Sequence, residues 1–202
     1  MLGLGLSFAK QTAKVFSFVK DQLKLLYRLY DNNPELLLSG ATSFDGTDDY
    51  ISIADSDSLS FGDGSTDSAL TFSAWVKAND VTLFYIISKG IYNTSGEYRL
   101  FINSSNKLIA RFMDESVNST YIGREYSTGV ESYENKWTHI VTTYDGSSNN
   151  SGVKIYINGL RVDNADNNAG SYVAMENLGA NVEIGRNNTT YGDGMINDVV
   201  LN

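Results

Sequence analysis

Apolar and polar residues alternate with a period of two along most of the chain after residue 39. The segments 70–78, LTFSAWVKA, and 153–162, VKIYINGLRV, show the pattern clearly. This period places successive side chains on opposite faces of a β-strand, so that one face packs on a core. The pattern predicts strands at residues 50–53, 70–78, 84–89, 98–103, 107–113, 120–124, 137–146, 153–162, 182–186 and 195–201.

Polar segments rich in Asn, Ser and Gly separate these strands. Asn158-Gly159 predicts a two-residue hairpin turn, because both turn positions need a positive φ that these residue types tolerate. INSSNK, residues 102–107, predicts a second hairpin. Residues 56–68, 145–152 and 187–194 are expected to be surface loops, where recognition residues are common.

A different period governs residues 7–30. Apolar residues recur there at spacings of three and four, which indicates an amphipathic α-helix. DNNP, residues 31–34, ends the predicted helix because Asn and Pro disfavour its continuation. One interpretation is that the helix packs on its own β-domain. A second is that it docks onto a partner or bundles with copies of itself, and a third is that its lysines hold it at a membrane surface. The docking face would contain Phe16, Val19, Leu23, Leu26 and Tyr30.

These elements predict three parts. Residues 1–33 form a leader and the amphipathic docking helix, residues 34–38 form a linker, and residues 39–202 form one β-domain. A chain of 202 residues can bury one good core, and many short strands indicate an all-β, two-sheet antiparallel jelly-roll sandwich behind one N-terminal helix. The chain has no cysteine, which excludes disulfides and cysteine-based metal sites.

The charge is unevenly distributed. The net charge is −9, of which residues 1–30 carry +4 and the remainder −13. An acidic domain repels phosphate backbones, so we expect no nucleic-acid binding. The first residues lack a secretory signal pattern. The chain contains no run of about 18 apolar residues, so the sequence predicts no membrane-spanning helix. We therefore expect synthesis in the cytoplasm without a signal peptide.

The order of several segments resembles a known family. FDGTDDYISI, LTFSAWVKA, KWTHIVTTYDG, VKIYINGLRV, VEIGRN and GMINDVVL together resemble the laminin G-like (LamG) jelly-roll domains of the concanavalin A-like lectin/glucanase superfamily. The resemblance runs from about Ser39 to Leu201 and implies two stacked antiparallel sheets, with ligands on a concave face or on rim loops. The expected core between the sheets contains Phe72, Trp75, Ile140, Ile155, Ile157, Ile184 and Val199.

The residues needed for glycoside hydrolysis are missing. Retaining glycosidases need two carboxylates about 5–5.5 Å apart, and the enzymes of this family carry them as Glu-x-Asp-x-Glu. No such run occurs, because Glu131 and Glu134 lie in a predicted turn while Asp114 and Glu115 end a strand. His139, the only histidine, is interpreted as structural. We therefore predict that the protein is not an enzyme, with a polysaccharide-degrading glucanase as an alternative.

A carboxylate-rich turn begins the predicted sandwich. Asp45, Asp48 and Asp49 lie there, and a jelly roll that pairs its first and last strands would bring Asn197 and Asp198 near them. Carboxylate, amide and backbone oxygens suit Ca²⁺, which takes six to eight such ligands. Calcium is therefore one interpretation, and the other is that the aspartates cap a tight turn through hydrogen bonds to its backbone.

Tyrosines are the candidates for sugar binding. Aromatic rings stack on pyranose faces while neighbouring polar groups hold the hydroxyls. The tyrosines in or next to polar loops are Tyr92, Tyr121, Tyr126, Tyr133, Tyr172 and Tyr191.

The N-terminus has a resemblance of its own. LGLGLSFAK, SFVKDQLKLLYRL and then GATSFDGTDDYI look like predicted virion proteins of tailed bacteriophages, in which a short leader and a helix precede a laminin G-like domain. This implies a capsid or tail appendage on the particle surface, docked on other virion proteins or on its own copies and displaying a domain that binds host-surface glycans. A capsid-stabilising decoration protein without a glycan ligand is the alternative.

Overall fold

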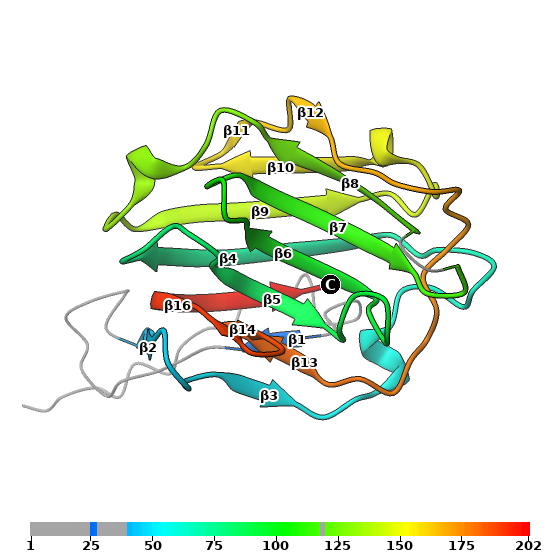
Figure 1. Ribbon diagram of the computed structural model, residues 1–202, viewed down its shortest axis with the longest axis horizontal. Helices are drawn as coiled ribbons and strands as arrows, with labels where there is room; N and C mark the ends of the chain where they lie inside the picture. Colours follow the sequence, from blue (N-terminus) through cyan, green and yellow to red (C-terminus); the bar gives the residue numbers. More distant parts are fainter. Residues whose placement is uncertain (1–24, 28–39, 118–119) are drawn as a thin grey trace, which may run out of the picture.

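The computed structural model describes residues 25–27, 40–117 and 120–202, which form two stacked antiparallel sheets. The first sheet contains, in spatial order, β1 (Leu25–Tyr27), β16 (Asp193–Leu201), β4 (Leu70–Ala78), β9 (Thr138–Tyr144), β10 (Val153–Ile157) and β11 (Leu160–Arg161). In addition, β2 (Thr42–Asp45) pairs with β16. The second sheet contains β12 (Ala165–Asp166), β8 (Thr120–Tyr126), β7 (Leu108–Asp114), β6 (Tyr98–Ile102), β5 (Tyr85–Lys89), β13 (Val182–Ile184) and β3 (Ile51–Ile53) in that order. Figure 1 shows the two layers, with β5 to β8 in green across β4, β9 and β10.

Short elements lie between the strands of the two sheets. A two-stranded hairpin is formed by β14 (Arg186–Asn187) and β15 (Thr190–Tyr191). Over the residues that the structure describes, the 3₁₀ turns are η2 (Asp57–Leu59), η3 (Glu131–Tyr133) and η4 (Asn150–Gly152). Among the described residues no helix has the length and apolar character needed to cross a membrane.

The predicted all-β sandwich is confirmed, and every predicted strand segment contains a strand. The Asn158-Gly159 hairpin is confirmed as well: β10 pairs with β11 around it, and the two turn residues have φ of 50° and 81°. The pattern did not predict β1, β2, β12, β14 or β15, which are two to four residues long and too short to show a period. Residues 187–194, predicted as a surface loop, contain part of the β14–β15 hairpin.

Side chains from both sheets fill the space between them. Phe72 and Ile140 from the first sheet and Ile184 from the second are buried there, as predicted. Trp75 is not in this core. It lies three residues after Phe72 on β4, so the pleat places it on the opposite, outer face, where it stacks on His139 with ring centroids 5.0 Å apart.

The N-terminal prediction needs a correction at its described residues. Leu25–Tyr27 were expected in the helix, but they form β1 and pair antiparallel with β16, Leu25 opposite Leu201. The physical reason is that β16 offers unpaired backbone groups to a neighbouring segment, and a strand satisfies them where a helix cannot. Leu26 of the predicted docking face therefore lies in β1, whereas Phe16, Val19, Leu23 and Tyr30 fall outside the described residues.

Candidate functional site

The outer face of the second sheet carries a cluster of arginine and aromatic side chains. On β6, Tyr98, Leu100 and Ile102 point into the core, so Arg99 and Phe101 lie on the outer face. Neighbouring strands add further aromatic and cationic groups to this face. We call the resulting cluster the arginine–aromatic face, formed by Tyr85, Tyr92, Arg99, Phe101, Arg111 and Tyr121.

Arg99 is buried within this cluster, and its Nε has no hydrogen-bond partner in the described part of the chain. Its side chain is 8% exposed, and its guanidinium carbon lies 4.6 Å from the ring centroid of Phe101 and 5.4 Å from that of Tyr92. The Nε atom is fully buried, and no described residue accepts a hydrogen bond from it. Burial lowers the pKa of Arg99, because the charged form has lost its water.

Arg111 lies directly opposite Arg99 on β7. Its guanidinium carbon is 3.9 Å from the ring centroid of Tyr121, and its Nε and Nη2 donate to Asn167 Oδ1 over 2.9 and 2.6 Å. Burial, and then the charge of Arg99, lower the pKa of Arg111 to about 10. Two like charges in a directly opposed pair destabilise a sheet.

A chain of polar contacts continues from Arg111 across the sheet. Asn167 Nδ2 donates to Glu125 Oε2 over 2.8 Å, and Lys107 Nζ forms a 3.1 Å salt bridge with Glu125 Oε1. Gly123 stands opposite Arg111 on β8 and presents no side chain beside it. Hydrogen-bonding groups therefore border the aromatic rings on one side.

The loop between β5 and β6 places Tyr92 over Arg99. Glu115 Oε1 holds this loop by accepting the backbone N–H of Asn93 over 2.8 Å and that of Gly96 over 3.3 Å. Gly90 has a φ of 75°, and a Cβ there would collide with the carbonyl oxygen of Ser95, so the turn requires glycine. Burial raises the pKa of Glu115 although the two N–H groups oppose the rise.

The structure divides the six tyrosines predicted for sugar binding. Tyr92 and Tyr121 meet on the arginine–aromatic face, with ring centroids 5.6 Å apart. Tyr191 lies elsewhere, 6.2 Å from the ring of Tyr50. The remaining three pack against the hydrophobic core and are Tyr126, Tyr133 and Tyr172.

The pattern had not identified Arg99 and Arg111. Both interrupt strands that are otherwise apolar, YRLFI and LIARFMD, so a cation inside an apolar strand was the available signal. Register then makes them direct neighbours, which a single strand pattern cannot reveal.

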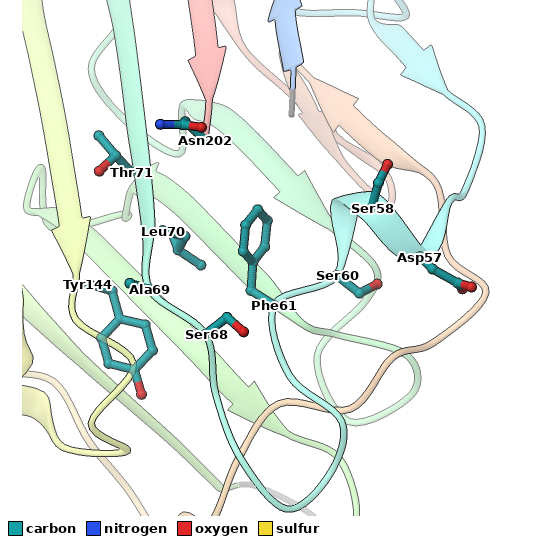
Figure 2. A pocket seen from close by; sticks show the side chains of 10 residues that line it. All are labelled: Asp57, Ser58, Ser60, Phe61, Ser68, Ala69, Leu70, Thr71, Tyr144 and Asn202. Carbon is teal, nitrogen blue, oxygen red and sulfur yellow. The ribbon is translucent and has the colours of Figure 1, made fainter. Parts of the chain in front are cut away.

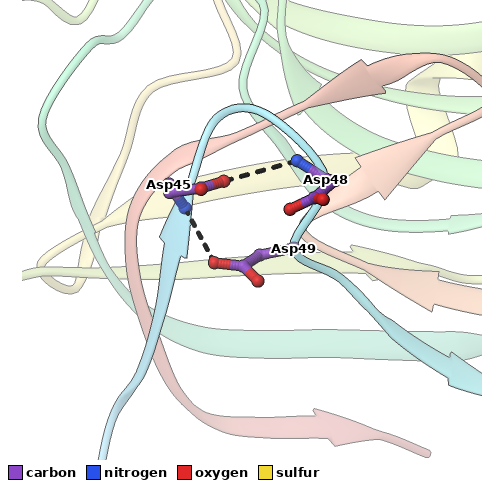
Figure 3. A group of neighbouring side chains, drawn as sticks. All are labelled: Asp45, Asp48 and Asp49. Carbon is purple, nitrogen blue, oxygen red and sulfur yellow. Dashed lines mark hydrogen bonds between the residues drawn. The ribbon is translucent and has the colours of Figure 1, made fainter.

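The aspartate turn is drawn in Figure 3. One oxygen from each of Asp45, Asp48 and Asp49 lies within 4.8 Å of the others, and all three residues are exposed. Asp45 Oδ1 accepts the backbone N–H of Thr47 over 2.8 Å and that of Asp48 over 3.3 Å, which lowers the pKa of Asp45. The turn-capping interpretation is therefore present in the structure, and carboxylate oxygens remain for a cation.

The first and last strands of the sandwich do pair, but the register differs from the expected site. Asp193 lies opposite Asp45, while Ile196 lies opposite Thr42. Asn197 therefore lies four residues beyond Asp193, about 13 Å along the strand, and Asp198 one residue further. The structure does not bring Asn197 and Asp198 to the aspartate turn, because the strand register places Asp193 there.

A hollow lies at the end of the first sheet. It has a volume of about 440 Å³, and its lining is drawn in Figure 2. The lining residues are Asp57, Ser58, Ser60, Phe61, Ser68, Ala69, Leu70, Thr71, Tyr144 and Asn202. Phe61, Leu70 and Tyr144 belong to the buried core, so their rings or chains offer no free face. The rest of the lining contains small and polar side chains and no aromatic ring, which makes this hollow a poorer platform for sugars than the arginine–aromatic face.

His139 has a hydroxyl partner on the outer face of the first sheet. Ser73 Oγ lies 2.9 Å from His139 Nε2. A nucleophile needs its base oriented by a third group, and among the described residues no carboxylate bonds to the other ring nitrogen. The stacked Trp75 instead gives this histidine a packing role.

Comparisons with known proteins agree with this architecture. The sequence profile of the concanavalin A-like lectin/glucanases superfamily matches residues 45–201. Curated protein sequences contain no match to the chain.

Several solved structures share the fold at low identity. A carbohydrate-binding module (CBM40) of the Ruminococcus gnavus IT-sialidase, bound to α2,3-sialyllactose, is 12% identical over 89% of this chain and 91% of the module, with a TM-score of 0.56. Domain 4 of AbnA, a GH43 extracellular arabinanase from Geobacillus stearothermophilus in complex with arabinotriose, is 16% identical over 89% and 91%, with a TM-score of 0.50. The ligand-binding domain of botulinum neurotoxin serotype D in complex with N-acetylneuraminic acid is 18% identical over 88% of this chain, which spans 42% of that domain, with a TM-score of 0.53. At these identities the likeness establishes the fold alone.

Proposed function

The chain belongs to the concanavalin A-like lectin/glucanase superfamily, and we propose that it is a non-catalytic module that binds glycans on its arginine–aromatic face. The observation that carries this proposal is the combination of partly exposed tyrosine rings with hydrogen-bonding side chains on one sheet face. Tyr92 and Tyr121 supply the rings, and Asn167 and Glu125 supply amide and carboxylate groups. Rings of this kind stack on sugars while such polar groups fix the hydroxyls.

The carboxylates of this region support binding rather than hydrolysis. Retaining hydrolysis needs one carboxylate as a nucleophile and a second as an acid. Glu125 is engaged by Lys107 and Asn167, and Glu115 accepts two backbone N–H groups of the Tyr92 loop. Both carboxylates thus have structural partners, which leaves neither free for these roles.

Glycan binding is tested by screening the full chain on an array of bacterial and animal glycans, followed by calorimetry with the best ligand. Tyr121→Ala should weaken binding about fivefold or more, since loss of one stacking ring removes about 1 kcal/mol or more. Tyr156→Ala, on the outer face of the first sheet, is the matched control and should bind as the wild type does. Absence of any glycan ligand, or an unchanged affinity of Tyr121→Ala, would refute the proposal.

We further propose that the protein is a virion appendage on the particle surface, docked through residues 1–33 onto other virion proteins or onto its own copies. The support is the resemblance of the N-terminal segments to virion proteins of tailed bacteriophages. Because β1 is part of the first sheet, a truncation at residue 39 would also remove a strand. Substitution of Phe16 and Val19 by Asp tests docking while leaving β1 in place.

Light scattering of the full chain provides the readout. We expect an oligomer, or co-sedimentation with particles, that the Phe16→Asp and Val19→Asp double variant loses. Wild-type and variant chains that are both monomeric and both absent from particles would rule out docking through this segment.

Calcium at the aspartate turn is a separate proposal. Three exposed carboxylates within 4.8 Å of one another suit a hard cation, with backbone oxygens and water completing its shell. Addition of about 1 mM CaCl₂ should raise the melting temperature, and Asp48→Asn should abolish the rise. Asp80→Asn is the control, because Asp80 is an exposed aspartate in a different turn, where it accepts the Thr82 N–H over 2.7 Å. An equal response of both variants would exclude this site.

A further inference from the structure

Arg99 carries a buried positive charge without a paired anion among the described residues. Its guanidinium is stacked on Phe101 and Tyr92, and its buried Nε has no hydrogen-bond partner among the described residues. A buried charge without a paired anion is costly, and proteins normally supply a carboxylate to such a group. The charge of Glu115 acts on Arg99 from nearby. Glu115 Oε1 accepts two backbone N–H groups of the Tyr92 loop, however, and no salt bridge joins Glu115 to Arg99.

Arg111 adds a second positive charge to the same place. It lies opposite Arg99 in the sheet, and its Nε and Nη2 are satisfied by the neutral amide oxygen of Asn167. The remaining N–H groups of its guanidinium point to no described acceptor. Two adjacent arginines with free donors form a natural receptor for a planar anion, because a guanidinium pairs with a carboxylate through parallel hydrogen bonds.

The surroundings define which anion fits. The chain as a whole carries a net charge of −9, which repels polyanions such as nucleic acids. A single carboxylate on an otherwise neutral ligand meets far less repulsion and finds local positive charge. The tyrosine rings beside the arginines suit the apolar face of a sugar ring.

We propose that the arginine–aromatic face selects glycans with a carboxylate-bearing sugar, whose carboxylate lies between Arg99 and Arg111 and whose ring contacts Tyr92 and Tyr121. This selectivity rests on the proposed glycan-binding function and names its ligand class. Arg111, Tyr92 and Tyr121 are partly exposed and form the entrance, while Arg99 lies deeper. Glu115 acts as a positioning residue, because it holds the loop that carries Tyr92.

The test uses pairs of oligosaccharides that differ in acidic groups, measured by calorimetry on the full chain. The pairs are 3′-sialyllactose with lactose, and cellobiouronic acid with cellobiose, so that each acidic member carries one carboxylate. 3′-Sulfolactose is included as a second anion. We expect an acidic member of at least one pair to bind at least tenfold more tightly than its neutral partner. This preference should decrease with added salt, because screening weakens charge pairing.

Arginine variants connect the preference to the site. Arg99→Gln and Arg111→Gln should each reduce the preference to less than threefold, and Arg99→Lys should retain part of it, because it keeps the charge but not the fork. Arg186→Gln is the matched control: Arg186 also stacks on a tyrosine, with its guanidinium carbon 3.3 Å from the Tyr50 centroid, but it has Glu183 as a partner. That variant should keep the wild-type preference, and circular dichroism checks that all four variants are folded.

Each other outcome has a distinct meaning. Equal binding of acidic and neutral partners, unchanged in Arg99→Gln, would refute the selectivity while glycan binding itself stands. Tighter binding of 3′-sulfolactose than of both carboxylates would overturn the assignment of the carboxylate. No binding of any oligosaccharide here and on the array would refute glycan binding together with the selectivity.

Discussion

Replacing Arg99 by methionine should stabilise the protein and abolish its preference for acidic sugars. Methionine fills a similar elongated volume between Phe101 and Tyr92 but carries no charge. The change therefore removes a buried cation whose Nε has no described partner and which lies opposite Arg111. A residue present for binding rather than for folding is expected to show this opposition between stability and function.

The magnitude follows from the contacts of Arg99. Removing an unsatisfied buried donor relieves about 1–3 kcal/mol, and removing the opposed like charge relieves about 0.2–1 kcal/mol. Against this, the cation–π contacts with the two rings are each worth about 0.5–2 kcal/mol. Methionine–aromatic contacts restore about 0.3–1.5 kcal/mol. The net expectation is a stabilisation of about 1 kcal/mol, which corresponds to a rise of about 2–4 °C in Tm for a domain of this size.

Thermal and urea unfolding of Arg99→Met and wild type measure this change. Arg111→Met is the comparison, because it leaves Asn167 Oδ1 without its donor and should give no stabilisation. A loss of more than about 1 kcal/mol in Arg99→Met would refute the reasoning, since it would mean that the stacked guanidinium holds the sheet face together.

Three further substitutions test the fold. Lys89→Met should destabilise by about 3–5 kcal/mol near neutral pH, because it leaves the buried carboxylate of Glu97 unpaired. Burial raises the pKa of Glu97, so this carboxylate binds a proton more readily in the folded protein than in the unfolded one. The destabilisation by Lys89→Met, measured by urea unfolding, should therefore shrink as pH falls toward about 4. A destabilisation independent of pH would contradict this pairing. Gly159→Ala should lower the free energy of unfolding by about 1–2 kcal/mol through its φ of 81° alone, since a Cβ there meets nothing within 4 Å. Gly179→Ala is the control, because Gly179 is also in open space but has no positive φ, and it should lose much less stability. Equal losses in the two variants would contradict a backbone cause. Phe72→Ala should cost about 3–5 kcal/mol, and a calorimetric loss below 1 kcal/mol would place its ring outside the core.

The sequence was sufficient to predict most of the fold because the strands are long enough to show their period. β4 was predicted from Leu70 to Ala78 and has those bounds, with alternating burial along its whole length. The same strand shows how core residues can be misassigned. Phe72 and Trp75 are both large and apolar, but odd spacing on a strand puts them on opposite faces.

The candidate site was predicted only in part, because it depends on register. Tyr92 and Tyr121 were predicted to supply sugar-stacking rings, yet nothing in either local segment shows that the two rings meet over Arg111. The register also decides the aspartate turn, where Asp193 rather than Asn197 stands opposite Asp45. Contacts between strands far apart in sequence follow from the fold as a whole, which single-segment patterns do not encode.

Lys89 provides an internal reference for the interpretation of Arg99, because both cations are buried in the second sheet. The Nζ atom of Lys89 lies 2.5 Å from Asp55 and 2.9 Å from Glu97, and two backbone carbonyl groups complete its shell. This fold therefore surrounds a buried structural cation with oxygen atoms. Arg99 has aromatic rings in those positions and a second arginine opposite, an arrangement that costs stability unless an anion from outside the described chain completes it. The contrast between two cations in one sheet makes a ligand the most economical physical reason for the arginine pair.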